Sequence, residues 1–149
     1  MLRSGFAAAA LLCATPAMAS GGLSCEGEHK GASVVVESGM GRGIPGSFLD
    51  FRGRIEFGDE SVAADLRTMD IKREDLAENW LDDKTLKLHI YRERTGDAPH
   101  GYVDLVINTW PKEEGTYSGS FVLTAFDASG AGAEGTRISV QGKVSCFVE

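Results

Sequence analysis

The sequence predicts an all-β protein: a single antiparallel β-sandwich of about seven or eight strands with one short helix, or alternatively a small β-barrel. Its segments alternate apolar and polar residues with a period of two, as strands with one buried face do. Nineteen of its 149 residues are glycine, and they fall between these segments, where turns need residues that tolerate positive φ. The short connections favour antiparallel neighbours, because parallel strands need long crossovers.

The first half of the chain contains three expected strands. An apolar run at 32–38 is the first, and a segment at 61–71 is the third. Between them, residues 47–57 alternate most clearly, with charged residues at every second position on one face. The opposite face is expected to be buried and consists of Leu49, Phe51, Gly53, Ile55 and Phe57.

Residues 72–83 are expected to form the one short helix. Leu76, Trp80 and Leu81 recur at helical spacing, and two acidic residues lie near the start, where they favour the helix dipole. We expect this helix to plug an end of the sheet or to cover one of its edges.

Four further strands are expected in the second half of the chain. They lie at 85–94, 101–110, 115–126 and 136–149, each with apolar residues in one phase and polar residues in the other. In the last of them, Cys146 shares the phase of the apolar residues. Its side chain is therefore expected to point into the core.

The chain begins with the three-part layout of a secretory signal peptide. Arg3 precedes an apolar run at 6–13, and Pro16 and a small-residue pattern that ends at Ala19 follow it. We expect cleavage after Ala19, which removes residues 1–19 and leaves a single β domain at 20–149. The apolar run is shorter than the roughly 18 residues of a membrane span, so we expect no stable membrane anchor and a periplasmic or secreted protein.

The three cysteines predict one disulfide. Cys13 lies within the predicted signal peptide, so Cys25 and Cys146 remain near opposite ends of the domain. Because exported proteins fold in an oxidising environment, we expect these two residues to form a structural disulfide. A metal site would need more ligands than two isolated cysteines, and a redox pair usually shows C-x-x-C spacing.

Charge and motifs argue against several function classes. The 15 basic and 22 acidic residues give a net charge of −7 at pH 7, which argues against nucleic acid as a partner.

Two G-x-G-x-x-G matches, at 41–46 and 130–135, are expected to be turns, because a strand and not a helix follows each. His29, His89 and His100 are scattered, and no Ser lies in a G-x-S-x-G elbow. We assign no catalytic residue, metal site or cofactor, and expect a monomer that is not an enzyme.

Outward-facing aromatic residues form the candidate contact surface. Tyr91, Tyr102 and Trp110 fall on the more polar phases of their strands. Rigid amphipathic rings are frequent where proteins contact other proteins or carbohydrates. The alternative is that these rings cover the second face of a sandwich or pack under the helix.

Four stretches of the sequence carry a resemblance to a known group. They are "SCEG" at 24–27, "WLDDKTLKLHIYRER" at 80–94, "GTYSGSFVL" at 115–123 and "GKVSCFVE" at 142–149. Together they resemble small exported β-domain proteins of Gram-negative bacteria, a group for which no activity is known. The resemblance implies an exported β domain and brings no site residue with it.

These observations predict a non-catalytic exported binding module, closed by one disulfide, whose partner the sequence does not identify; another envelope protein is one candidate. Two alternatives remain open. One is a barrel-type carrier of a small apolar ligand, which would need an enclosed cavity of roughly 300 Å³ or more. The other is a periplasmic inhibitor of a hydrolase.

Overall fold

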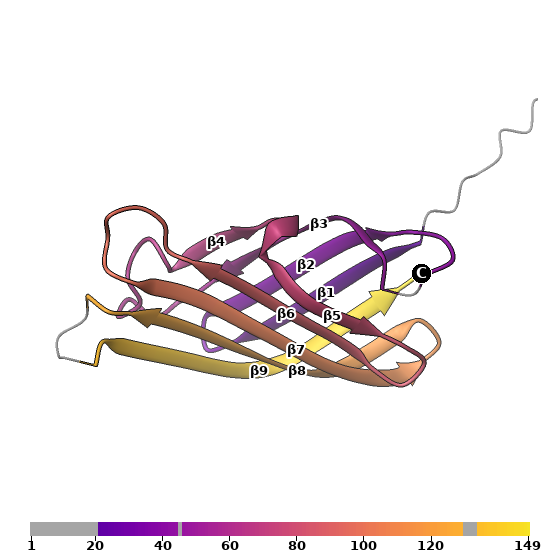
Figure 1. Ribbon diagram of the computed structural model, residues 1–149. Coiled ribbons are helices and arrows are strands. Elements are labelled where there is room, and N and C mark those ends of the chain that lie inside the picture. The colour runs from indigo at the N-terminus through magenta and orange to yellow at the C-terminus, as the bar shows by residue number, and fades with distance from the viewer. Residues whose placement is uncertain (1–20, 45, 130–133) are drawn as a thin grey trace, which may run out of the picture.

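The protein folds into one antiparallel β-sheet. The computed structural model describes residues 21–44, 46–129 and 134–149, and in these ranges nine strands share a single sheet (Figure 1). The all-β prediction is confirmed with nine strands instead of seven or eight, while the predicted signal peptide at 1–19, with Cys13, lies outside the described residues. The strands are β1 (Gly22–His29), β2 (Ala32–Met40), β3 (Phe48–Glu56), β4 (Thr68–Ile71), β5 (Leu76–Leu81), β6 (Leu86–Glu93), β7 (Gly101–Glu113), β8 (Thr116–Asp127) and β9 (Thr136–Val148).

The sheet is a meander in which the first strand also pairs with the last. Its order is β4-β3-β2-β1-β9-β8-β7-β6-β5, so strands pair with their neighbours in sequence and β1 also pairs with β9. The two free edges are β4 and β5, which are joined by a 3-10 turn, η1 (Arg73–Asp75). The sheet curls into a half-barrel, with β1–β3 behind β5–β7 (Figure 1). It therefore resembles a barrel that stays open between β4 and β5.

The predicted helix at 72–83 is wrong. Only a three-residue 3-10 turn is helical there, and Leu76–Leu81 form β5, which pairs with β6. The register shifts between Leu76 and Glu78, so that Leu76 is buried in the core while Trp80 is exposed. The helical spacing of Leu76 and Trp80 in the sequence therefore does not mark a shared buried face, because the two side chains lie on opposite faces of the strand. A strand forms because it satisfies the backbone groups along the edge of β6, which outweighs the local pattern.

The predicted burial of Leu49 is also wrong. Its surface is 52% exposed, and Phe48 is buried in its place. Asp50 has a positive φ of 50°, and the register between β2 and β3 shifts at this point. Such a bulge reverses the alternation of the side chains. Beyond it, Phe51 and Ile55 are buried as predicted.

Phe121 is the largest side chain that is fully buried in the interior. Two inward-facing glycines make room for its ring. A Cβ atom added at Gly27 would come within 2.8 Å of the ring, and one added at Gly142 would come within 2.6 Å. The sheet can close tightly around Phe121 because β1 and β9 carry no side chain at these two points.

Cys25 and Cys146 form the predicted disulfide. The two residues are direct partners across β1 and β9, and both are buried. The bridge joins positions 121 residues apart and links the first strand of the sheet to the last. The predicted inward phase of Cys146 is thereby confirmed.

Side chains cover the two free edges of the sheet. Arg92 on β6 donates from Nη2 to the carbonyl of Asp70 on β4 at 2.8 Å, and from Nε to Asp75 Oδ1 of η1 at 2.7 Å. On β5, Asn79 Nδ2 donates to the carbonyl of Gly46 in the β2–β3 connection at 2.9 Å. These contacts tie β4 and β5 to the rest of the fold and make both edges poor templates for pairing with another chain.

Candidate functional site

A groove of about 580 Å³ lies where β5, β6 and β7 run side by side. We call it the β5–β7 groove. The strand register builds it from two adjacent rows of outward-facing side chains. One row consists of Trp80, Lys87 and Asn108, which are direct cross-strand neighbours, and the next row centres on His89. The complete lining is Ala77, Glu78, Asn79, Trp80, Lys87, Leu88, His89, Val106 and Asn108.

Trp80 forms one wall of the groove and is 60% exposed. Its indole is nevertheless held in place, because Nε1 donates a hydrogen bond to Asp82 Oδ2 at 3.0 Å. Asp82 is fixed in turn, since its Oδ1 accepts from the backbone N–H groups of Lys84 at 2.8 Å and Thr85 at 2.7 Å. The bond from Trp80 and these turn bonds lower the pKa of Asp82 to about 2. A large flat ring thus faces solvent in a defined orientation.

His89 is also held in one orientation. Its Nε2 lies 3.1 Å from Asp104 Oδ2, and both side chains are about one-third exposed. The predicted outward position of His89 is confirmed. The groove therefore has two oriented side chains near the exposed Lys87: Trp80 is its neighbour across the strand pair, and His89 is its neighbour along β6.

A ladder of aromatic rings continues from the groove across β6, β7 and β8. Tyr91 and Tyr102 have ring centroids 5.5 Å apart, and those of Tyr102 and Phe126 are 5.4 Å apart with planes inclined by 26°. The guanidinium of Arg137 lies 5.7 Å from the Phe126 centroid. Burial, together with a hydrogen bond to Glu93, raises the pKa of Tyr91 to about 12. Because these rings cover one another, the ladder stabilises the sheet beside the groove.

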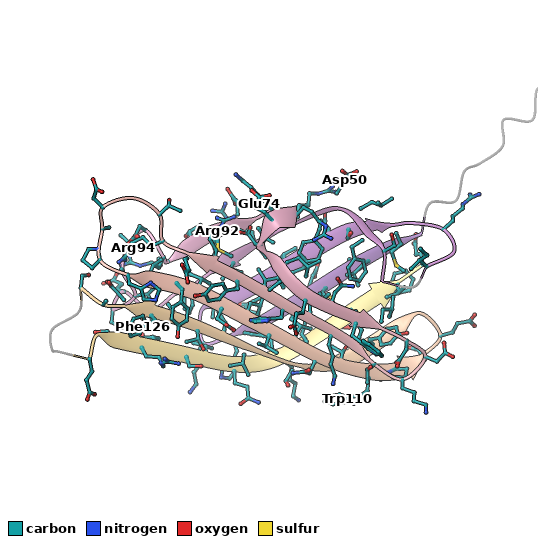
Figure 2. The ribbon with its side chains drawn as sticks, in the orientation of Figure 1. Asp50, Glu74, Arg92, Arg94, Trp110 and Phe126 are labelled. Carbon is teal, nitrogen blue, oxygen red and sulfur yellow. A yellow bond between two sulfur atoms is a disulfide. The ribbon has the colours of Figure 1, made fainter. Side chains whose placement is uncertain are left out.

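The structure brings together two of the three predicted contact residues. Tyr91 and Tyr102 are neighbours in the ladder, whereas Trp110 lies eight residues further along β7, about 26 Å from Tyr102 at the usual rise of a strand. Trp110 is 53% exposed and lies far from Phe126 (Figure 2). It belongs to the same end of the outer face as the Trp80 row, since Asn108 precedes it by two residues.

Sequence reasoning missed Trp80 as a site residue because it assigned this tryptophan to a helix. The signal that identifies it is the period of two in Glu78, Trp80 and Asp82, which places the three side chains on one face of a strand. Phe126 was not predicted from the sequence either, because only the pairing of β7 with β8 places it beside Tyr102.

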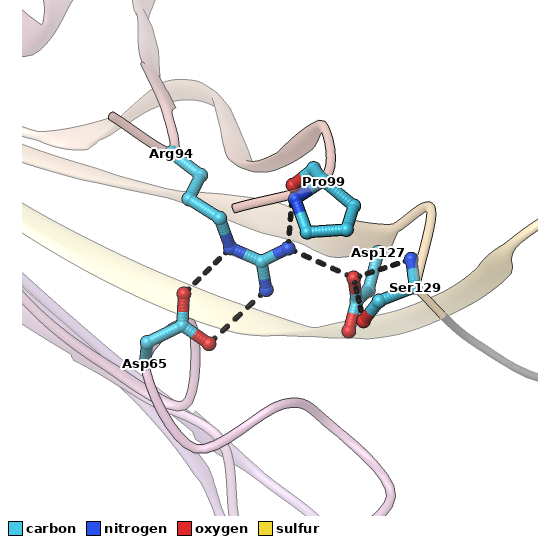
Figure 3. A network of polar contacts seen from close by, with 5 residues as sticks. All are labelled: Asp65, Arg94, Pro99, Asp127 and Ser129. Carbon is cyan, nitrogen blue, oxygen red and sulfur yellow. Dashed lines mark hydrogen bonds and ion pairs between the residues drawn. The ribbon is translucent and has the colours of Figure 1, made fainter. Parts of the chain in front are cut away.

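An ion-pair network lies toward the other end of the sheet (Figures 2 and 3). The side chain of Arg94 is 8% exposed and donates to Asp65 at 2.6 and 3.1 Å, to Asp127 at 2.9 Å and to the carbonyl of Pro99 at 2.8 Å. Arg94 and the donors of Ser129 hold the pKa of Asp127 well below its ordinary value. Since arginine stays protonated, this network joins three connections of the chain and supplies no acid or base.

Other surface hollows occur in the described chain, and the one beside His29, Ser120 and Gln141 amounts to about 460 Å³. Two more, beside Arg92 and beside Pro111, amount to about 290 and 300 Å³. The space bounded by Val62, Leu66, Ala125 and Ile138 amounts to only about 10 Å³. Within residues 21–44, 46–129 and 134–149, no three His, Cys, Asp or Glu side chains are placed to hold a metal ion. Over the same ranges, no helix has the length and apolar character needed to cross a membrane.

The chain matches no protein family model, no curated protein and no solved structure. The resemblance to small exported proteins therefore stays a prediction. The β5–β7 groove and the residues that orient its walls are the basis for assigning a function.

Proposed function

We propose that this protein is a non-catalytic binding module of the cell envelope, periplasmic or secreted, and that it binds its partner through the β5–β7 groove. One observation carries the proposal: Trp80 is 60% exposed and yet fixed by its bond to Asp82. An exposed tryptophan that is already ordered loses little conformational entropy on binding, and tryptophan is the residue most enriched among binding hot spots.

The shape of the groove favours binding over catalysis. Glu78, Lys87 and His89 line an open surface, where bulk water reaches a bound molecule. Catalysis by general acids and bases gains most where closure excludes water and shifts pKa values.

The packed interior favours surface binding over the carriage of an apolar ligand. Inward positions of the strands are filled by large side chains such as Phe121, Leu105 and Leu123, all fully buried. A carrier would need an enclosed space of roughly 300 Å³ in this region. The buried disulfide suits an oxidising, non-cytoplasmic compartment, which supports an envelope location.

Site-specific photo-crosslinking in the native host tests the proposal. A photoreactive phenylalanine analogue at position 108, in the same cross-strand row as Trp80, is expected to give a discrete crosslinked product, which disappears when Trp80→Ala is added. The control carries the same analogue at Leu49, a position on β3 that is 52% exposed and lies outside the groove. Identical products from positions 108 and 49, or products that persist with Trp80→Ala, would overturn the proposal.

A further inference from the structure

We infer that the β5–β7 groove binds a saccharide, with one sugar ring stacked on the indole of Trp80 and its hydroxyl groups bonded to the polar side chains of the groove. This inference rests on the proposed function and names the class of ligand. It follows from three properties of the groove: a free aromatic face, a mixed set of hydrogen-bonding groups and side chains that are already oriented.

The free aromatic face belongs to Trp80. The rings of the neighbouring ladder cover one another, but among the described residues Trp80 has no ring–ring contact. Its Nε1 edge is engaged by Asp82, and Trp80 is 60% exposed, so its ring is accessible to a ligand. A pyranose presents a flat patch of C–H groups, which buries apolar area against such a face.

The remaining lining supplies hydrogen-bond donors and acceptors in close proximity. Lys87 donates, the carboxylate of Glu78 accepts, and the amide of Asn108 does both. Neighbouring hydroxyl groups of a sugar each donate and accept, so they need such a mixed set. An apolar peptide would leave these groups without partners, and desolvated polar groups without partners weaken binding.

The size and rigidity of the groove agree with this ligand class. Its volume of about 580 Å³ lies within the range of about 300–1,000 Å³ that small-ligand sites occupy. Asp82 orients Trp80, and Asp104 orients His89, before any ligand arrives. The net charge of −7 also disfavours the binding of strongly anionic polymers. Neutral or weakly charged glycans are therefore the suitable class of ligand.

The chain contains only two tryptophans, which makes the test direct. In the Trp110→Phe variant, Trp80 is the sole indole fluorophore. We expect cellotriose, maltotriose or tri-N-acetylchitotriose to change its emission in a saturable way, with a dissociation constant of about 1 mM or below. In the same background, Asn108→Ala is expected to weaken binding about tenfold. The matched control is Ser118→Ala, an exposed position on β8 outside the groove, which is expected to leave binding unchanged.

Two results separate the saccharide inference from the proposed function. If none of the three sugars changes the emission up to about 20 mM, or if Asn108→Ala and Ser118→Ala behave alike, the saccharide inference is wrong. A Trp80-dependent crosslink to an envelope protein would then still support the binding module. Loss of that crosslink as well would overturn both.

Discussion

Trp80 Nε1 and Asp82 Oδ2 are joined by a 3.0 Å hydrogen bond between residues two positions apart, at the point where β5 ends and the turn to β6 begins. Asp82 thereby has two roles. It closes the turn through Lys84 and Thr85, and it orients the most exposed aromatic ring of the outer face. The turn that aligns β5 with β6 thus also sets the geometry of the groove.

The mobility of Trp80 is expected to depend on Asp82 and on pH. The pKa of Asp82 is depressed from 3.8 to about 2, so the stabilisation by its carboxylate is complete above the ordinary pKa and is lost as the pH falls through about 2. In a Trp110→Phe background, we expect the fluorescence anisotropy of Trp80 to stay constant from about pH 7 to 5 and to fall below about pH 3. Asp82→Ala should show the low anisotropy throughout, whereas equal anisotropy in both proteins at neutral pH would contradict the prediction.

Loss of Arg94 is expected to destabilise the protein strongly. Its side chain is nearly buried, and Arg94→Gln leaves Asp127 and Asp65 without their cationic partner. Breaking such a pair costs about 3 kcal/mol in the free energy of unfolding. Arg52→Gln is the control, because the Arg52–Glu37 pair is exposed and contributes about 0–1 kcal/mol. Urea denaturation gives the free energy of unfolding of both variants. Equal losses of this free energy would show that the network contributes no more than a surface ion pair.

Removal of the disulfide is expected to lower stability by about 4–5 kcal/mol in the loop-entropy model, because the bridge closes a loop of 121 positions. The double variant Cys25→Ala with Cys146→Ala keeps the interior free of unpaired thiols. Its urea midpoint, compared with that of the parent protein with and without reductant, gives the effect. A parent protein that shows the same midpoint under both conditions would contradict the prediction.

Gly142→Ala is expected to be destabilising by about 1–3 kcal/mol, since the new methyl group would overlap both the ring of Phe121 and the Cβ atom of His29. Gly22→Ala provides the matched control. It also lies in a strand, but a Cβ atom there meets its nearest neighbour, the carbonyl of Ser38, at an ordinary 3.5 Å. Thermal unfolding should therefore separate the two variants, and an equal effect would mean that strand propensity and not the contacts with Phe121 and His29 governs position 142.

The candidate site was only partly predictable from the sequence. The outward phase of His89, Tyr91 and Tyr102 follows from the alternation within their strands, which is a local property. The cross-strand neighbours of these residues cannot be derived in this way, because they depend on the register between strands. Trp80 was assigned to a helix, because the bulge after Leu76, which turns Trp80 outward, exists only when β5 pairs with β6.

The sequence by itself determined the all-β class, the antiparallel arrangement, the buried phases of most strands and the Cys25–Cys146 disulfide. These features rest on alternation along one segment and on the small number of cysteines. Only the tertiary structure decided that the nine strands form one curled sheet with its free edges at β4 and β5, and that Trp80, Lys87 and Asn108 share a row. The physical reason is that strand register and sheet curvature arise from contacts between distant segments, and a shift of one residue would turn every side chain of a strand to the other face.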